Sequence, residues 1–146
     1  MKHTFLKDIM VKNPVTIGVD EPFYRVAELF QKHGIRHVLV VDDKSELVGL
    51  VTQRDVNAVV SPRKSEEGVY FYERSEMARI ILKCVMTRDI ETLSQDDTLY
   101  HAVELMVKKK YGCIPVVNEK KNVIGIITPI DVLKLLLKKG EKEGLI

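Results

Sequence analysis

A chain of 146 residues has the length of one ordinary domain, or of two half-domains that share a core. Its 23 lysines and arginines against 21 aspartates and glutamates give a net charge of only +2, which argues against a protein bound to nucleic acid through its charge. Two cysteines without a CxxC spacing indicate neither a zinc site nor a disulfide framework, so we expect no metal and a reducing, cytoplasmic location.

The N-terminal segment is a short, apolar-rich lead-in that ends at Met10. It lacks the hydrophobic run of a signal peptide. No stretch of the chain approaches the roughly 18 apolar residues that a membrane-spanning helix needs. We therefore expect neither export nor insertion into a membrane.

The elements that follow the lead-in alternate between strand and helix. Residues 15–17 form a short β-branched stretch typical of a strand, and Asp20 then gives a helix-start signal. Apolar residues at positions 23, 26, 27 and 30 lie on one face of the expected helix. Apolar runs at 38–41 and 47–51 flank a turn-rich segment and predict a β-hairpin, and a closing helix is expected from Thr52 through Val59.

The middle of the chain differs in composition from its two halves. Residues 61–68 are polar and turn-like, whereas residues 69–72 include three of the nine aromatic residues. We expect the later part of this segment to be a helix that continues into the second half. Two roles are open for the aromatic side chains: sealing a packing seam or a dimer interface, which is favoured, or stacking on a nucleobase.

The second half repeats the first. Residues 6–60 align without a gap on residues 82–136, and 16 of these 55 positions are identical. The second copy has a strand candidate at 91–93, a helix-start signal at Asp96, hairpin runs at 114–117 and 123–127, and a closing helix from Thr128 through Leu136. The chain is therefore a tandem duplication of a β-α-β-β-α unit with a three-stranded sheet.

The duplication predicts a fold of the α/β (α+β) class. One small sheet cannot cover its own apolar face, so we expect the tandem repeats to pack sheet to sheet about a pseudo-twofold axis, with ligand clefts between them. We assign residues 1–61 to repeat 1, 62–80 to a partly helical linker, 81–140 to repeat 2 and 141–146 to a tail. The charged residues from Lys138 onward are expected to fray.

Two equivalent segments resemble a known family. Residues 49–55 (GLVTQRD) and 125–131 (GIITPID) are similar to the signature that closes the third strand of CBS domains. Residues 8–10 and 84–87 resemble the lead segment of that family, residues 34–37 resemble the segment before its second strand, and residues 114–117 resemble the strand itself. From about residue 5 to 138 the chain thus resembles a CBS pair, or Bateman module. The resemblance implies a homodimeric sensor that requires no cofactor, binds an adenosine-containing ligand and regulates a partner protein.

The chemistry of such a ligand suggests which residues bind it. The vicinal diol of a ribose can donate two strong hydrogen bonds to one carboxylate, a role that suits Asp55 and Asp131. Thr52 and Thr128, one helical turn earlier, can add hydroxyl contacts. Phosphates favour cations and helix N-termini. Arg36, His37 and Arg54 would supply these, while by analogy with the family the adenine would lie near Thr16 and Thr92.

The same Thr-x-x-Asp pattern also fits a helix capping box, so capping and ligand binding both remain open. The two copies differ at the proposed phosphate contacts, because Gly112, Cys113 and Ile130 replace Arg36, His37 and Arg54. We therefore expect the site with Asp55 to prefer phosphorylated nucleotides. The site with Asp131 is expected to bind weakly, to take a less anionic adenosyl ligand or to stay empty.

The four histidines are scattered and form no recognisable arrangement with a nucleophile, so we expect no catalysis. The favoured function is a non-catalytic regulatory module that binds AMP, ADP, ATP or S-adenosylmethionine and signals to a partner protein. The alternative is a ligand-free dimerisation or interaction module that docks on an enzyme or a transporter.

Overall fold

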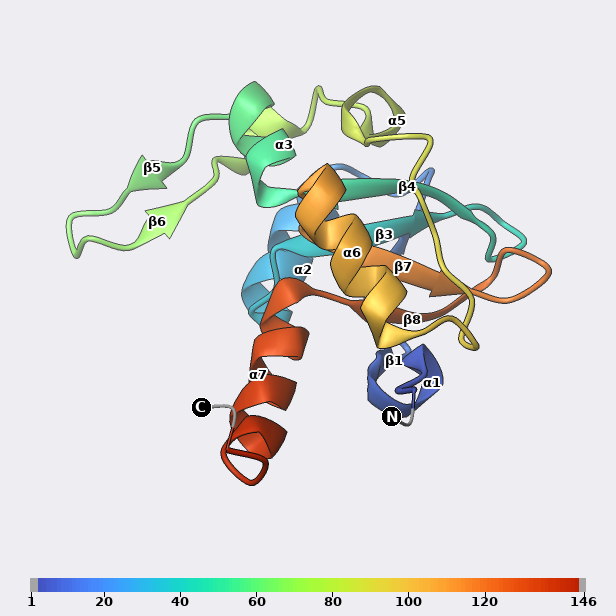
Figure 1. Cartoon of the computed structure of the whole chain (residues 1–146). Coiled ribbons are helices and arrows are strands. Elements are labelled where there is room, and N and C mark those ends of the chain that lie inside the picture. The colour runs from blue at the N-terminus through green and yellow to red at the C-terminus, as the bar shows by residue number, and fades with distance from the viewer. Residues whose placement is uncertain (1–2, 145–146) are drawn as a thin grey trace. The chain divides into compact units, whose positions relative to one another are not determined.

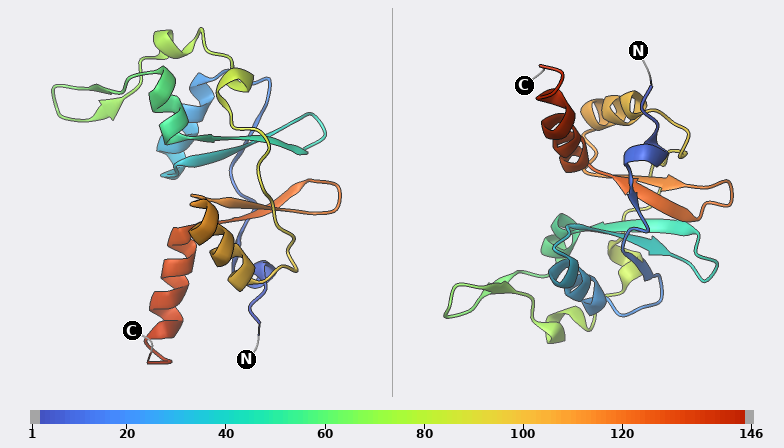
Figure 2. Two further views of the ribbon diagram at one scale, coloured as in Figure 1. Left: turned by 45° about the horizontal axis from the view of Figure 1, so that its top comes forward. Right: turned by 90° about the horizontal axis from the view of Figure 1, so that it is seen from below.

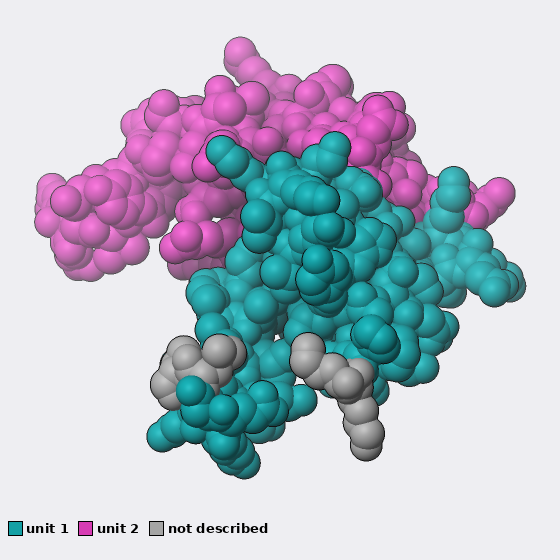
Figure 3. All heavy atoms as spheres, in the orientation of Figure 1, with its two compact units in different colours: residues 1–14, 91–146 teal, residues 15–90 magenta. Residues whose placement is uncertain are grey.

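The computed structural model describes residues 3–144 and contains two compact units, each with its own sheet and helices (Figures 1 and 3). Unit 1 consists of residues 1–14 and 91–146, and unit 2 consists of residues 15–90. The chain therefore passes from one unit to the other twice, after residue 14 and after residue 90. Each unit combines the lead-in of one sequence repeat with the body of the other.

Unit 2 contains the elements predicted for the first repeat. These are β2 (Thr16–Gly18), α2 (Tyr24–His33), β3 (His37–Val41), β4 (Leu47–Thr52) and α3 (Gln53–Val59), followed by β5 (Arg63–Lys64), β6 (Tyr70–Phe71), α4 (Arg74–Met77) and α5 (Leu82–Val85). The sheet order is β2-β3-β4, with β2 parallel and β4 antiparallel to β3. Helices α2 and α3 lie on one face of this sheet (Figure 2). The predicted hairpin and one-sided helix are both confirmed, since Val26 and Phe30 of α2 are buried with Val38 of β3.

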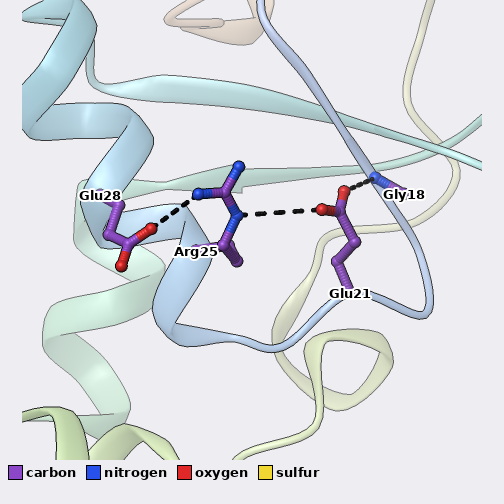
Figure 4. Close-up of polar contacts among 4 residues, drawn as sticks. All are labelled: Gly18, Glu21, Arg25 and Glu28. Carbon is purple, nitrogen blue, oxygen red and sulfur yellow. Dashed lines mark hydrogen bonds and ion pairs between the residues drawn. The ribbon is translucent and has the colours of Figure 1, made fainter.

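The start of α2 differs from the prediction. The helix begins at Tyr24 rather than at Asp20, and no side chain caps it. Glu21 stabilises the preceding turn instead: its Oε2 accepts a hydrogen bond from the Gly18 N–H at 2.7 Å, and Arg25 lies between Glu21 and Glu28 (Figure 4). Asp20 forms an exposed ion pair with Lys83 of α5, with 3.3 Å between Nζ and Oδ1, so it contacts the lead-in of the other repeat rather than capping a helix.

Unit 1 contains α1 (Leu6–Ile9), β1 (Val11–Lys12), α6 (Leu99–Lys109), β7 (Ile114–Val117), β8 (Val123–Ile127) and α7 (Pro129–Gly140). The predicted strand at 91–93 is wrong: only one parallel bridge, from Leu93 to Val116, forms there. The third strand of the sheet β1-β8-β7 is instead β1, which directly follows the N-terminal lead-in. Helix α6 begins at Leu99 with Thr98 as its cap, rather than at Asp96.

Helix α7 is longer than predicted. It continues past Leu136 to Gly140, so Lys138 and Lys139 lie in its last turn rather than in a fraying tail. Lysines in that position interact favourably with the helix dipole. Of the expected tail, residues 145–146 lie outside the described part of the chain.

The two lead-ins pack in equivalent ways. Leu6 in unit 1 and Leu82 in unit 2 are almost fully buried. A Cβ atom added at Gly125 would lie 2.4 Å from the sulfur of Met10, and one at Gly49 would lie 2.4 Å from the sulfur of Met86. Both glycines are therefore required by the close approach of a methionine from the lead-in.

The linker is more structured than expected. Residues 65–68 form a polar turn, as predicted, but the residues on either side of it, β5 and β6, pair as an antiparallel hairpin that was not predicted and that extends beyond α3 (Figure 1). The linker is partly helical through α4, but this helix does not continue into the second repeat as expected, because α4 ends at Met77 and α5 begins only at Leu82. Tyr70 and Phe71 are exposed, so they seal no seam within the described chain. Among residues 3–144, no helix has both the length and the apolar character needed to cross a membrane.

Candidate functional site

The Thr-x-x-Asp segment of unit 2 forms a capping box at the start of α3. The Thr52 hydroxyl oxygen accepts a hydrogen bond from the Asp55 N–H at 3.1 Å, and Asp55 Oδ2 accepts one from the Thr52 N–H at 2.8 Å. Both residues are only partly buried. Capping thus occupies one oxygen of Asp55, and Oδ1 makes no hydrogen bond within residues 3–144.

Arg36 and His37 lie beside this capping box. His37 is the first residue of β3 and pairs with Thr52 across the sheet, while the Arg36 carbonyl accepts a hydrogen bond from the Gln53 N–H at 3.1 Å. Burial and then the neighbouring Arg36 charge lower the pKa of His37, and the Asp55 carboxylate opposes this shift. The structure therefore brings four of the predicted residues together: Arg36, His37, Thr52 and Asp55.

The equivalent position in unit 1 has the same cap but different neighbours. Asp131 Oδ2 accepts hydrogen bonds from the N–H and the hydroxyl of Thr128, at 2.8 and 2.9 Å. The neighbouring β7 is preceded by Gly112 and Cys113 in place of Arg36 and His37. Burial raises the pKa of the Cys113 thiol to about 12, so this position stays uncharged. Cys113 is buried, with 5% of its surface exposed.

The other predicted residues lie around these two caps. Arg54 is in the first turn of α3 with an exposed side chain, and Thr16 is on β2, paired with Leu39 of β3. Thr92 lines a cavity of about 690 Å³ in unit 1 beside the turn between β7 and β8. Neither Thr128 nor Asp131 lines that cavity.

Unit 2 also contains a larger cavity that was not predicted. It has a volume of about 750 Å³ and lies between α2, the start of α3 and the linker. Arg36 lines it, but Thr52 and Asp55 do not. In the sequence, the aromatic cluster at residues 70–72 of the linker is the feature that indicates this cavity. The cavity does not follow from that cluster alone, because its wall includes the linker hairpin, which the sequence analysis did not predict. In the part of the chain that the structure describes, no three His, Cys, Asp or Glu side chains could hold a metal ion together.

Comparison with known proteins identifies the family. The CBS domain profile matches residues 6–61 and 82–138. The L-aspartate semialdehyde sulfurtransferase of Methanocaldococcus jannaschii is 28% identical over 132 residues, covering 90% of this chain and 23% of that protein. The inosine-5'-monophosphate dehydrogenase of the same organism is 28% identical over 127 residues, covering 87% of this chain and 22% of that protein. The chain thus spans less than a quarter of the length of these two enzymes.

Solved structures of similar length agree with this assignment. The CBS domain pair of protein MJ0100, in complex with 5'-methylthioadenosine and S-adenosyl-L-methionine, matches with a TM-score of 0.78 and 27% identity, covering 94% of this chain and 99% of that one. A putative acetoin utilization protein from Vibrio cholerae matches with a TM-score of 0.79 and 27% identity, covering 98% and 97%. Two complete family matches in one chain, on a fold shared with CBS pairs, show that this chain belongs to the CBS domain family and forms a CBS pair.

Proposed function

We propose that the chain senses an adenosine-containing ligand and passes the ligand state to a partner protein. The observation that carries the proposal is the cluster at the start of α3, where the half-buried Asp55 carboxylate lies beside Thr52, Arg36 and His37. The free oxygen of Asp55 can accept a ribose hydroxyl, and Arg36 with Arg54 can bind a phosphate. The adenosyl ligands of the similar CBS pair of MJ0100 support the same ligand class.

The two units should prefer different ligands. Unit 2 has Arg36, His37 and Arg54, so we propose that its site prefers AMP, ADP or ATP. At the equivalent positions unit 1 has Gly112, Cys113 and Ile130, which provide no cation for a phosphate. Its site around Asp131 would therefore take a less anionic adenosyl ligand such as S-adenosylmethionine, or remain empty.

Asp55→Ala and Asp131→Ala form a matched pair that tests this proposal. Each variant removes one capping box, so both should lose about 1 kcal/mol of stability without ligand. A ligand present at about 100 times its dissociation constant adds about 2.7 kcal/mol, which a thermal-shift assay detects. With AMP, ADP or ATP, that shift should disappear in Asp55→Ala and persist in Asp131→Ala. An undiminished nucleotide shift in Asp55→Ala would assign the Asp55 carboxylate to capping alone.

We also propose that the chain is a homodimer. Ile130, Leu133 and Leu137 of α7 expose 57%, 52% and 66% of their surfaces and form one stripe, since they are three and four residues apart. A contiguous exposed apolar stripe commonly marks an interaction site. Sedimentation equilibrium should give a dimer for the wild type and a monomer for Leu133→Lys combined with Leu137→Lys. The control Lys134→Ala should remain dimeric, and a monomeric wild type would exclude this assembly.

The regulated partner and the compartment complete the proposal. The relatives named as enzymes match this chain over one part of their length, which supports a module that regulates an enzyme. The two cysteines are unpaired, which supports a reducing, cytoplasmic location. Without any response to an adenosyl ligand, the exposed stripe on α7 would favour the alternative, an interaction module that docks on its target without a ligand.

A further inference from the structure

The linker turns one side of unit 2 into a groove. The cavity of about 750 Å³ is bounded by α2, by the start of α3 and by the linker residues that follow Val60. Small-molecule sites in proteins typically have volumes of about 300–1,000 Å³, so the groove is large enough for a ligand.

Aromatic rings form one side of this groove. Tyr70 of β6 exposes 69% of its surface and lines the groove together with Tyr24, Phe71 and Tyr72. The Tyr72 hydroxyl donates a hydrogen bond to the side-chain oxygen of Asn57 in α3, which fixes the base of the hairpin to the unit. Exposed rings that are fixed around a cavity offer stacking surfaces to a planar ligand.

Two positive charges lie among these rings. The Arg74 guanidinium lies 3.8 Å from the centroid of the Tyr24 ring, and Arg36 lines the same groove. Within residues 3–144, neither arginine forms an ion pair. Glu28 is the one carboxylate of the groove lining, and it is already paired with Arg25 at 2.7 Å (Figure 4). The groove is therefore aromatic and carries uncompensated positive charge.

We propose that this groove is a second binding site, for a small planar aromatic anion. The ring of the ligand stacks on the tyrosines and on the Arg74 guanidinium, and its anionic group pairs with Arg74 and Arg36, because a guanidinium both stacks on aromatic faces and binds oxyanions. The groove shares Arg36 with the proposed adenosyl site but differs from it otherwise, since neither Thr52 nor Asp55 lines the groove. The two unpaired arginines favour an anion over a neutral ligand.

Fluorescence titration with 8-anilinonaphthalene-1-sulfonate, an aromatic sulfonate, tests the proposal. The wild type should bind this probe about tenfold more tightly than its neutral analogue N-phenyl-1-naphthylamine, because only the anion pairs with the arginines. Arg74→Gln should weaken binding of the sulfonate by about tenfold, since it removes both the charge and the stacked plane. Tyr70→Ser should weaken it by about fivefold, and because Tyr70 is exposed this variant should keep the fold.

Arg79→Gln is the matched control, because it removes the same charge from an exposed linker position that does not line the groove. Its affinity for the sulfonate should stay within about twofold of the wild type. Asp55→Ala should also leave this affinity unchanged, so a failure of the adenosyl proposal would not affect the result. Equal binding of the sulfonate by the wild type, Arg74→Gln and Tyr70→Ser would overturn the proposal, and so would equal affinity for the neutral analogue.

Discussion

The two units share the contacts that hold a lead-in on a sheet, and they differ where a ligand is proposed to bind. Lys7 pairs with Asp96 in unit 1 as Lys83 pairs with Asp20 in unit 2. Both units also bury a leucine of the lead-in and place a methionine against a glycine of the sheet. These residues are identical in the two repeats, whereas Arg36, His37 and Arg54 have no charged counterpart in the second. The duplication has thus kept the residues that assemble each unit and has changed those around the caps.

The sharpest test of the shared scaffold is to truncate the buried leucine of each lead-in. Leu6→Ala and Leu82→Ala should each lower the free energy of unfolding by about 2–5 kcal/mol, because each leaves a cavity in a packed core. Urea unfolding measures both values. As a control, Ile81→Ala next to α5 should change stability by less than about 0.5 kcal/mol, since Ile81 is exposed. A large loss in only one of the leucine variants would show that the two lead-ins are not equivalent.

The glycines that face the methionines give the next largest effect. Gly49→Ala and Gly125→Ala would each place a methyl group 2.4 Å from a methionine sulfur. The methionine must move, so we expect each variant to lose about 1–3 kcal/mol in urea unfolding. Gly18→Ala is the control, because its methyl group would meet only Glu21 at 3.4 Å, and it should cost less than about 0.5 kcal/mol. Similar stability of all three variants would contradict the proposed role of the methionine contact.

Much of the fold could be predicted because the repeat contains strong local patterns. The apolar runs of both hairpins and the periodic faces of α2 and α6 are set by neighbouring residues, and the structure confirms them. Asp20 and Asp96 were misinterpreted as helix starts because their partners, Lys83 and Lys7, lie far away in sequence. The exchange of lead-ins depends on such long-range contacts, which a local pattern does not reveal.

The candidate site shows the same limit. The Thr-x-x-Asp pattern predicted both capping boxes, because a cap involves only residues within one helical turn. The proximity of Arg36 and His37 to Asp55 followed from the predicted hairpin, which joins the start of β3 to the end of β4. The groove was not predicted because it forms only where the linker folds back on α2. The linker hairpin was not predicted because each of its strands has two residues, too few to show an alternating apolar and polar pattern.

The smallest predicted effect separates the units by pH. Because burial and Arg36 lower the pKa of His37 below its ordinary value of 6.5, the unfolded chain takes up a proton on this residue before the folded chain does. The free energy of unfolding should therefore fall as the pH decreases from about 7.5 to 5.5, and His37→Gln should reduce that fall. Arg36→Gln should reduce it in part, because one cause of the shift is removed, whereas loss of the opposing carboxylate in Asp55→Asn should increase it.

Unit 1 provides the control for this pH dependence. Cys113 occupies the position equivalent to His37, and with a pKa of about 12 its thiol does not titrate between pH 5.5 and 7.5. Cys113→Ser should therefore leave the slope of stability against pH unchanged, even though replacing a buried thiol with a hydroxyl lowers stability at every pH. Urea unfolding at both pH values measures the slopes. His33→Gln is a second control, because His33 is an exposed histidine in unit 2, the unit that contains His37. If His37→Gln retained the slope of the wild type, the pH response would have to arise outside the cluster at the start of α3.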